Sequence, residues 1–129
     1  MQVLIVEDEP LIALAYKAIA EECGFEVAGT AAESSAAVRI ARARRPDIAI
    51  IDLRLDDGPT GDWLARHLHA ELGVRPIFVT GTPDLLTSAA RSIAVGILVK
   101  PVPYDHLVAI MRAAAVAPAS GRQHAVAVI

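Results

Sequence analysis

The sequence contains little sulfur, few aromatic side chains and no excess of positive charge. Its one cysteine, Cys23, excludes an internal disulfide bond and a zinc site built from cysteines. Aromatic residues are only 4% of the 129 residues while hydrophobic residues are 54%, so the core must be aliphatic. Every apolar run ends well before the ~18 residues that a transmembrane helix needs. The formal net charge of −3 offers no general attraction to nucleic acid.

The N-terminal residues lack the basic stretch that opens a signal peptide. Together with the single cysteine, this favours a reduced, cytoplasmic protein. The length is typical of one domain, which we place at residues 1–116. Residues 117–129 are expected to form a flexible tail and are too few for an output domain.

Short runs rich in valine and isoleucine alternate with stretches of helical periodicity. Most of these runs are almost continuously apolar, which is typical of strands buried on both faces of a parallel sheet. The alternation predicts an α/β fold, a doubly wound five-stranded parallel sheet with strand order 2-1-3-4-5 and right-handed crossovers. The predicted strands are residues 3–6, 26–29, 48–51, 76–79 and 96–99, and the predicted helices are residues 10–23, 33–45, 62–72, 84–93 and 104–115.

Polar side chains stand where four of these strands end. Glu7 and Asp8 follow the first strand, Asp52 ends the third, Thr80 ends the fourth and Lys100 ends the fifth. In open α/β sheets, ligands bind at the carboxyl ends of the strands, where the strand order reverses. The first and third strands flank that point, so we expect the acidic residues to face each other there.

These side chains predict a phosphoryl-transfer site. Three neighbouring carboxylates repel one another unless a cation neutralises them, and Mg²⁺ prefers such oxygen ligands and adds phosphate oxygens. Thr80 offers a hydroxyl donor, and Lys100 offers a mobile charge suited to phosphate. Asp52 would be the nucleophile and would form an aspartyl-phosphate.

Four short motifs resemble the receiver domain of two-component response regulators, the CheY-like family. They are Val-Glu-Asp-Glu at 6–9, Ile-Asp-Leu at 51–53, Val-Thr-Gly at 79–81 and Val-Lys-Pro at 99–101. No single motif is specific, but the ordered set at these spacings is. The resemblance covers residues 2–116 and implies a flavodoxin-like receiver fold.

The resemblance also implies roles for the acidic residues and the residues near them. Asp52 is the implied phosphoacceptor. Asp8 and Asp52 would ligate Mg²⁺ through carboxylates, Glu7 largely through water, and Arg54 through its backbone carbonyl.

Further roles are implied for residues at the ends of the fourth and fifth strands. Thr80 would hydrogen-bond the phosphoryl group and Lys100 would pair with it, while the Lys100–Pro101 bond would be cis. Arg54 and Thr82, two residues beyond Asp52 and Thr80, would tune hydrolysis of the phosphoaspartate.

One position departs from the family pattern. Receivers usually carry Phe or Tyr three residues before the lysine, where the ring turns inward as the threonine moves, and here that position is Ile97. The stretch Phe78 to Pro83 resembles an alphaproteobacterial subgroup of receivers with a Phe-x-Thr-Gly motif and no such aromatic. We therefore hypothesise that loop 81–88 and the following helix reorder on phosphorylation.

The resemblance implies a stand-alone response regulator rather than an enzyme, one that catalyses only its own phosphorylation and dephosphorylation. A sensor histidine kinase or histidine phosphotransfer protein would donate the phosphoryl group from a phosphohistidine. The output would be an unknown protein partner or a role as phosphate sink or relay. We expect no nucleic-acid or membrane partner.

Three alternatives stay open at this point. A haloacid-dehalogenase-type phosphatase also uses an aspartate nucleophile, but it needs a second aspartate where Arg54 stands. A flavin-binding flavodoxin-like protein would suffer repulsion between its flavin phosphate and the acidic stretch Glu7-Asp8-Glu9. A degenerate receiver would act as a constitutive binding module.

Three other acidic residues are expected to form turns and to cap the third helix rather than to bind metal: Asp56, Asp57 and Asp62.

Overall fold

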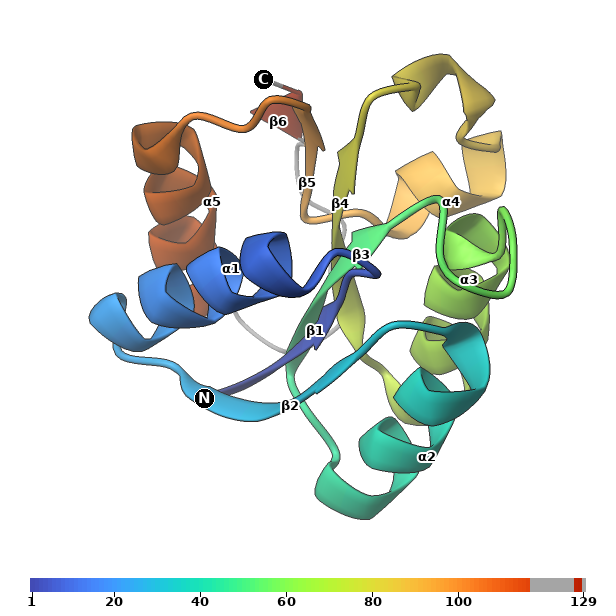
Figure 1. Ribbon diagram of the computed structural model, residues 1–129, viewed down its shortest axis with the longest axis horizontal. Helices are drawn as coiled ribbons and strands as arrows, with labels where there is room; N and C mark the ends of the chain where they lie inside the picture. Colours follow the sequence, from blue (N-terminus) through green and yellow to red (C-terminus); the bar gives the residue numbers. More distant parts are fainter. Residues whose placement is uncertain (117–126, 129) are drawn as a thin grey trace.

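The computed structural model describes residues 1–116 and 127–128, which form a parallel sheet covered by helices on both faces (Figure 1). The strand order is β2-β1-β3-β4-β5-β6, and every neighbouring pair is parallel. The predicted order of the first five strands is therefore confirmed. The strands are β1 (Gln2–Val6), β2 (Glu26–Ala31), β3 (Ile48–Asp52), β4 (Arg75–Thr80), β5 (Gly96–Val99) and β6 (Ala127–Val128).

The helices divide into two layers. Helices α1 and α5 pack together on one side of the sheet, and α2, α3 and α4 pack in sequence on the other (Figure 1). Their bounds are α1 (Pro10–Glu22), α2 (Ser34–Arg44), α3 (Gly61–Leu72), α4 (Ser88–Ile93) and α5 (Tyr104–Val116), with a short 3₁₀ helix η1 (Pro83–Leu85) before α4.

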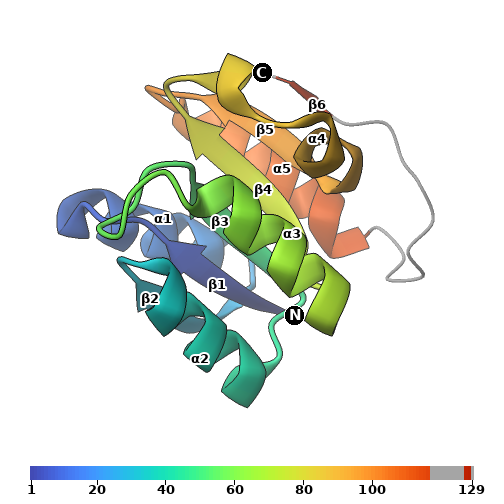
Figure 2. The same cartoon turned by 90° about the vertical axis from the view of Figure 1, so that its right-hand side faces the viewer.

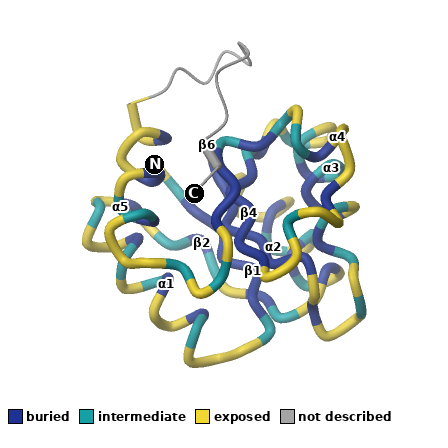
Figure 3. Tube along the Cα trace, turned by 90° about the horizontal axis from the view of Figure 1, so that it is seen from above, coloured by how far each residue is buried: buried dark blue, intermediate teal, exposed yellow. Residues whose placement is uncertain are grey.

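The continuous apolar runs of the central strands are explained by these two layers. Successive side chains of a strand point to opposite faces of the sheet. In β3, Ala49 and Ile51 join the core beneath α2, α3 and α4, while Ile48 and Ile50 join the core beneath α1 and α5. Both sets are buried, so the strand needs no polar face, and Figure 3 shows the buried sheet surrounded by exposed helix surfaces.

The helix predicted over residues 84–93 is confirmed only from Ser88 to Ile93, because the chain leaves helical geometry at the two residues before Ser88. Leu86 and Thr87 are extended and separate η1 from α4. Thr87 is the N-cap of α4, with φ −69° and ψ 160°, and its side chain accepts a hydrogen bond from the amide of Ala90. Leu86 instead turns into the core beneath α3 and α4, where it is 5% exposed.

A short sixth strand, which was not predicted from the sequence, lies at the edge of the sheet. Ala127 pairs with Gly96, and Val128 pairs with Ile97 (Figure 2). The remaining residues of the predicted tail, 117–126 and 129, lie outside the described residues. Within residues 1–116 and 127–128, no helix is long and apolar enough to span a bilayer.

Gly61 fixes how closely the first turn of α3 approaches the end of β3. Its amide donates to the carbonyl of Leu53 at 3.0 Å. A Cβ atom at this position would collide with the carbonyl oxygen of Asp52 and lie 2.7 Å from the Cα of Leu53. Only glycine therefore permits this contact between α3 and the backbone of Asp52.

We predict that Gly61→Ala lowers the free energy of unfolding by about 1–3 kcal/mol, because backbone atoms must shift to admit the methyl group. Gly81→Ala is the matched control, since a Cβ there meets no atom within 4 Å. Urea unfolding of both variants checks this expectation. Equal stability of the two variants would contradict the steric argument.

Candidate functional site

Three carboxylates meet at the carboxyl edge of the sheet. Glu7 and Asp8 follow β1, and Asp52 ends β3, the strand that pairs with β1 in parallel. One carboxylate oxygen of each lies within 4.8 Å of the other two. Glu7 and Asp52 are only 3% and 7% exposed, so little solvent screens the repulsion among these charges.

Lys100 balances part of this charge. It follows β5, and its ammonium reaches back over the end of β4. Nζ donates to Oδ2 of Asp52 at 2.7 Å and to Oε1 of Glu7 at 3.0 Å. The Lys100–Pro101 peptide bond is cis. One ammonium among three acidic groups leaves the cluster with an excess of negative charge when all of them are ionised.

The protonation of the cluster reflects burial and pairing. Burial raises the pKa of Glu7 to about 7, although hydrogen bonds from Lys100 and from the amide of Glu9 act in the opposite direction. Burial by itself disfavours the ammonium of Lys100, but hydrogen bonds to Asp52 and Glu7 outweigh it and raise the pKa of Lys100 above its usual value. The ammonium is therefore held charged, while Glu7 titrates near neutrality.

Thr80 lies at the end of β4 with its hydroxyl engaged by its own loop. Oγ1 of Thr80 accepts from the amide of Thr82 at 2.9 Å and lies 3.3 Å from Oγ1 of Thr82. The side chain is 1% exposed. The backbone carbonyl of Thr80 accepts from the amide of Lys100 at 2.9 Å, so the two residues are held together through the main chain.

Arg54 and Ile97 occupy contrasting places around the site. The amide of Arg54 donates to Oδ1 of Asp52 at 3.4 Å, while its side chain is exposed. Ile97 lies in β5 opposite Phe78 of β4 and is 1% exposed. It belongs to the core beneath α3 and α4, so the position that usually carries an aromatic ring is filled by a buried aliphatic side chain.

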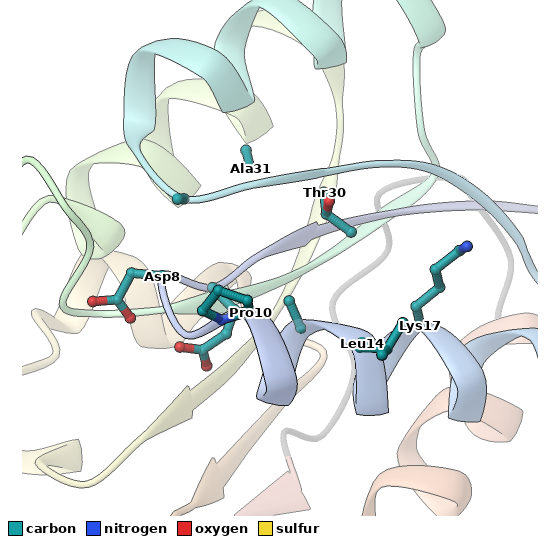
Figure 4. A pocket seen from close by; sticks show the side chains of 9 residues that line it. Asp8, Pro10, Leu14, Lys17, Thr30 and Ala31 are labelled. Atoms are coloured by element: carbon teal, nitrogen blue, oxygen red, sulfur yellow. The ribbon is translucent and has the colours of Figure 1, made fainter.

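A cavity of about 420 Å³ opens beside the acidic group, between α1 and the C-terminal end of β2. Figure 4 shows Asp8 at one end and the ammonium of Lys17 at the other, with the hydroxyl of Thr30 on the wall across from Pro10. Lys17 and Thr30 could not be singled out from the sequence, because nothing in the local pattern of α1 or β2 shows that the two elements enclose a space.

The three other acidic residues do not cap α3. The N-cap of α3 is Thr60, and its side chain makes no capping hydrogen bond, so the capping prediction is wrong. Asp57 accepts from the hydroxyls of Thr60 and Ser34 and ties the loop after β3 to the start of α2. Asp62 accepts from Thr87, which is 25 residues further along the chain.

We predict that, without added metal, the protein loses stability as pH rises from about 4.5 to about 7. The folded state holds a proton on Glu7 that the unfolded chain has released over this interval, because the pKa is raised from 4.5 to about 7. The side chain in Glu7→Gln is neutral at every pH, so this variant should not lose stability in the same way. Its free energy of unfolding, compared with that of the unmodified protein, should become more favourable by about 1–3 kcal/mol between pH 5 and pH 8.

Urea unfolding at both pH values checks this expectation, with Glu9→Gln as the exposed neighbouring control. Parallel pH dependence of Glu7→Gln and the unmodified protein would contradict the assignment of this proton to Glu7.

Known proteins that resemble this chain identify its family. A model of the response regulator receiver domain family matches residues 3–112. The chain is 35% identical over 101 residues to the phyllosphere-induced regulator PhyR of Methylorubrum extorquens, a match that covers 78% of this chain and 38% of that protein. It is 32% identical to the transcriptional regulatory protein PdtaR of Mycobacterium tuberculosis, covering 83% of this chain and 53% of PdtaR.

Solved structures agree in fold. The receiver domain of PhyR from Erythrobacter litoralis superposes with a TM-score of 0.81 at 28% identity and covers 91% of this chain and 93% of that one. A CheY-like receiver domain from Methylobacillus flagellatus has a TM-score of 0.78 at 28% identity and covers 88% and 98% of the two chains. The chain belongs to the response regulator receiver domain family.

Proposed function

We propose that the protein is a phosphorylation-controlled signalling module of a two-component system, with Asp52 as its phosphoacceptor. The observation that carries this proposal is the placement of the Asp52 carboxylate, which is buried and contacts the ammonium of Lys100 at 2.7 Å beside two further acidic residues. A sensor histidine kinase or a histidine phosphotransfer protein would supply the phosphoryl group from a phosphohistidine.

In the transfer step, a carboxylate oxygen of Asp52 attacks the phosphorus of the phosphohistidine. The new O–P bond forms an acyl phosphate, and the P–N bond breaks with its electron pair left on the imidazole nitrogen. Lys100 would pair with the phosphoryl oxygens, and the contact of its Nζ with the Asp52 carboxylate supports this role. Thr80 can donate its hydroxyl to the phosphoryl group once it turns away from Thr82.

The donor set fits Mg²⁺. Three acidic side chains lie within 4.8 Å of one another with a single ammonium among them, and hard oxygen ligands of this kind suit that ion. Glu7, Asp8, Asp52 and the backbone carbonyl of Arg54 would hold it. Bound there, Mg²⁺ would supply positive charge that offsets the repulsion between carboxylates and phosphate.

The output is expected to pass through loop 81–88 and α4, because Ile97 cannot act as an aromatic switch. When the Thr80 side chain rotates toward the phosphoryl group, the amide of Thr82 loses its acceptor, so the start of the loop must rearrange. The receiving partner would be another protein. PhyR of Bartonella quintana, which matches at 29% identity with a TM-score of 0.75, is described as an anti-anti-sigma factor. A role as phosphate sink or relay would use the same chemistry.

These features favour signalling over turnover of a separate substrate. A phosphatase of the haloacid-dehalogenase type needs a carboxyl group where Arg54 stands, and a guanidinium cannot exchange a proton at neutral pH. We place this activity in the cytoplasm, where kinases of this class act, with no membrane or nucleic-acid partner.

We expect the protein to gain one phosphoryl group when it is incubated with acetyl phosphate and Mg²⁺, and to lose this gain in Asp52→Asn, which removes the nucleophilic carboxylate. Intact mass spectrometry measures both, with chelation of Mg²⁺ as a further control. Absence of the gain with acetyl phosphate and also with a cognate kinase would contradict the proposal and favour a degenerate receiver.

We predict that Arg54→Ala shortens the lifetime of the phosphoaspartate by roughly 3- to 10-fold, which corresponds to at most about 1.4 kcal/mol in the barrier. The amide of Arg54 donates to Oδ1 of Asp52 and its side chain is exposed, so we expect truncation of that side chain to give water easier access. The stability of the fold should hardly change, because the side chain is exposed.

Decay of the phosphorylated mass after removal of acetyl phosphate measures the lifetime, and Thr82→Ala should also alter it. Arg39→Ala, an exposed arginine on α2, is the control. A lifetime equal to that of the unmodified protein in Arg54→Ala would count against this tuning role.

A further inference from the structure

Asp62 makes a set of contacts that the proposed chemistry does not use. Its Oδ2 accepts from the amide of Thr87 at 2.9 Å, and both of its carboxylate oxygens lie within 3.1 Å of the Thr87 hydroxyl. Arg66, one turn along α3, donates to Oδ1 at 2.8 Å. Burial alone would raise the pKa of Asp62, but the hydrogen bonds from Thr87 and Arg66 outweigh it and lower that pKa, so the carboxylate stays charged.

Thr87 links Asp62 to the first turn of α4 by hydrogen bonds. Its hydroxyl donates to Asp62 and accepts from the amide of Ala90 at 3.1 Å, and its carbonyl accepts from the amide of Arg91 at 3.0 Å. Helix α4 has six residues, and Ala90 is its one buried residue. A helix this short has little stability of its own, and loss of an N-cap destabilises it further. The start of α4 therefore depends on the Asp62–Thr87 contact.

The loop before α4 is held at both ends. Arg91 donates through Nη2 to the carbonyl of Pro83 at 2.5 Å and through Nε to the carbonyl of Leu86 at 3.4 Å. At the other end, the amide of Thr82 is held by the hydroxyl of Thr80. The loop thus runs from the expected phosphoryl-binding hydroxyl to the carboxylate of Asp62.

Asp62 is also linked to the phosphoacceptor Asp52 through its neighbour in the chain. It follows Gly61, whose close approach to the backbone of Asp52 leaves no room for a methyl group. Helices α3 and α4 pack against each other (Figure 1). The start of α3 is therefore fixed to Asp52, whereas Thr87, the N-cap of α4, is fixed to α3 by polar contacts that can open.

We propose that the Asp62–Thr87 contact is a latch that holds loop 81–88 and α4 in the unphosphorylated arrangement, and that phosphorylation of Asp52 opens it. This inference rests on the proposed function. When Thr80 turns to the phosphoryl group, the amide of Thr82 loses its acceptor, the loop rearranges, and Thr87 leaves Asp62. Asp62 is then a positioning residue. It couples phosphorylation of Asp52 to rearrangement of α4, a role that an aromatic side chain at the position of Ile97 would otherwise fill.

Amide hydrogen exchange of the full chain tests the latch, with and without acetyl phosphate and Mg²⁺, on samples whose phosphoryl content is read from intact mass. In the unmodified protein, phosphorylation should speed exchange in residues 87–93 by about 5- to 10-fold. Asp62→Ala and Thr87→Val should show this faster exchange without phosphorylation and gain nothing further from it. Thr87→Ser keeps the hydroxyl and should behave like the unmodified protein, as should Asp84→Ala, an exposed carboxylate of η1.

The outcomes separate the latch from the function on which it rests. Phosphoryl uptake with unchanged exchange in residues 87–93 would overturn the latch and leave the receiver chemistry standing. A phosphorylation-dependent increase that persists in Asp62→Ala would also overturn it, since a residue that only stabilises the fold would leave that increase intact. Absence of phosphoryl uptake on Asp52 would overturn the proposed function and the latch together.

Discussion

The rest of the site depends on one interaction, the pairing of the Lys100 ammonium with the carboxylates of Asp52 and Glu7. Two buried acidic side chains lie next to a third at the edge of a sheet, and without a cation their repulsion would oppose the fold that brings them together. The contact joins residues that are 48 and 93 positions apart in the chain. It forms because β1, β3 and β5 are parallel and end at the same edge.

The need to keep Asp52 next to Lys100 explains why the residues around Asp52 are closely packed. The acceptor must keep one fixed position relative to Lys100, and Gly61 holds the start of α3 directly against the Asp52 backbone. The loop after β4 is held instead by hydrogen bonds at Thr80, Thr82, Asp62 and Thr87. One side of the phosphoacceptor is therefore sterically fixed, and the other can exchange one set of polar contacts for another.

The strands and the residues at their ends could be predicted because local patterns determine them: a strand covered on both faces must be apolar throughout, and polar residues mark where it ends. The break between η1 and α4 could not, since the partner of Thr87 is Asp62, far away in sequence. The constraint on Gly61 could not be predicted either, because it comes from the backbone of Asp52. The cavity beside Asp8 and the short strand β6 likewise arise from contacts between distant segments.

We expect Asp52 to be the single phosphoacceptor among the three neighbouring acidic residues, because its carboxylate makes the shorter of the two contacts with the ammonium of Lys100, at 2.7 Å. Reduction of the phosphorylated protein with borohydride converts the acyl phosphate of an aspartate into homoserine, and peptide mass spectrometry then locates it. We predict homoserine at position 52 alone. Conversion at Asp8, or a reduced side chain at Glu7, would contradict it.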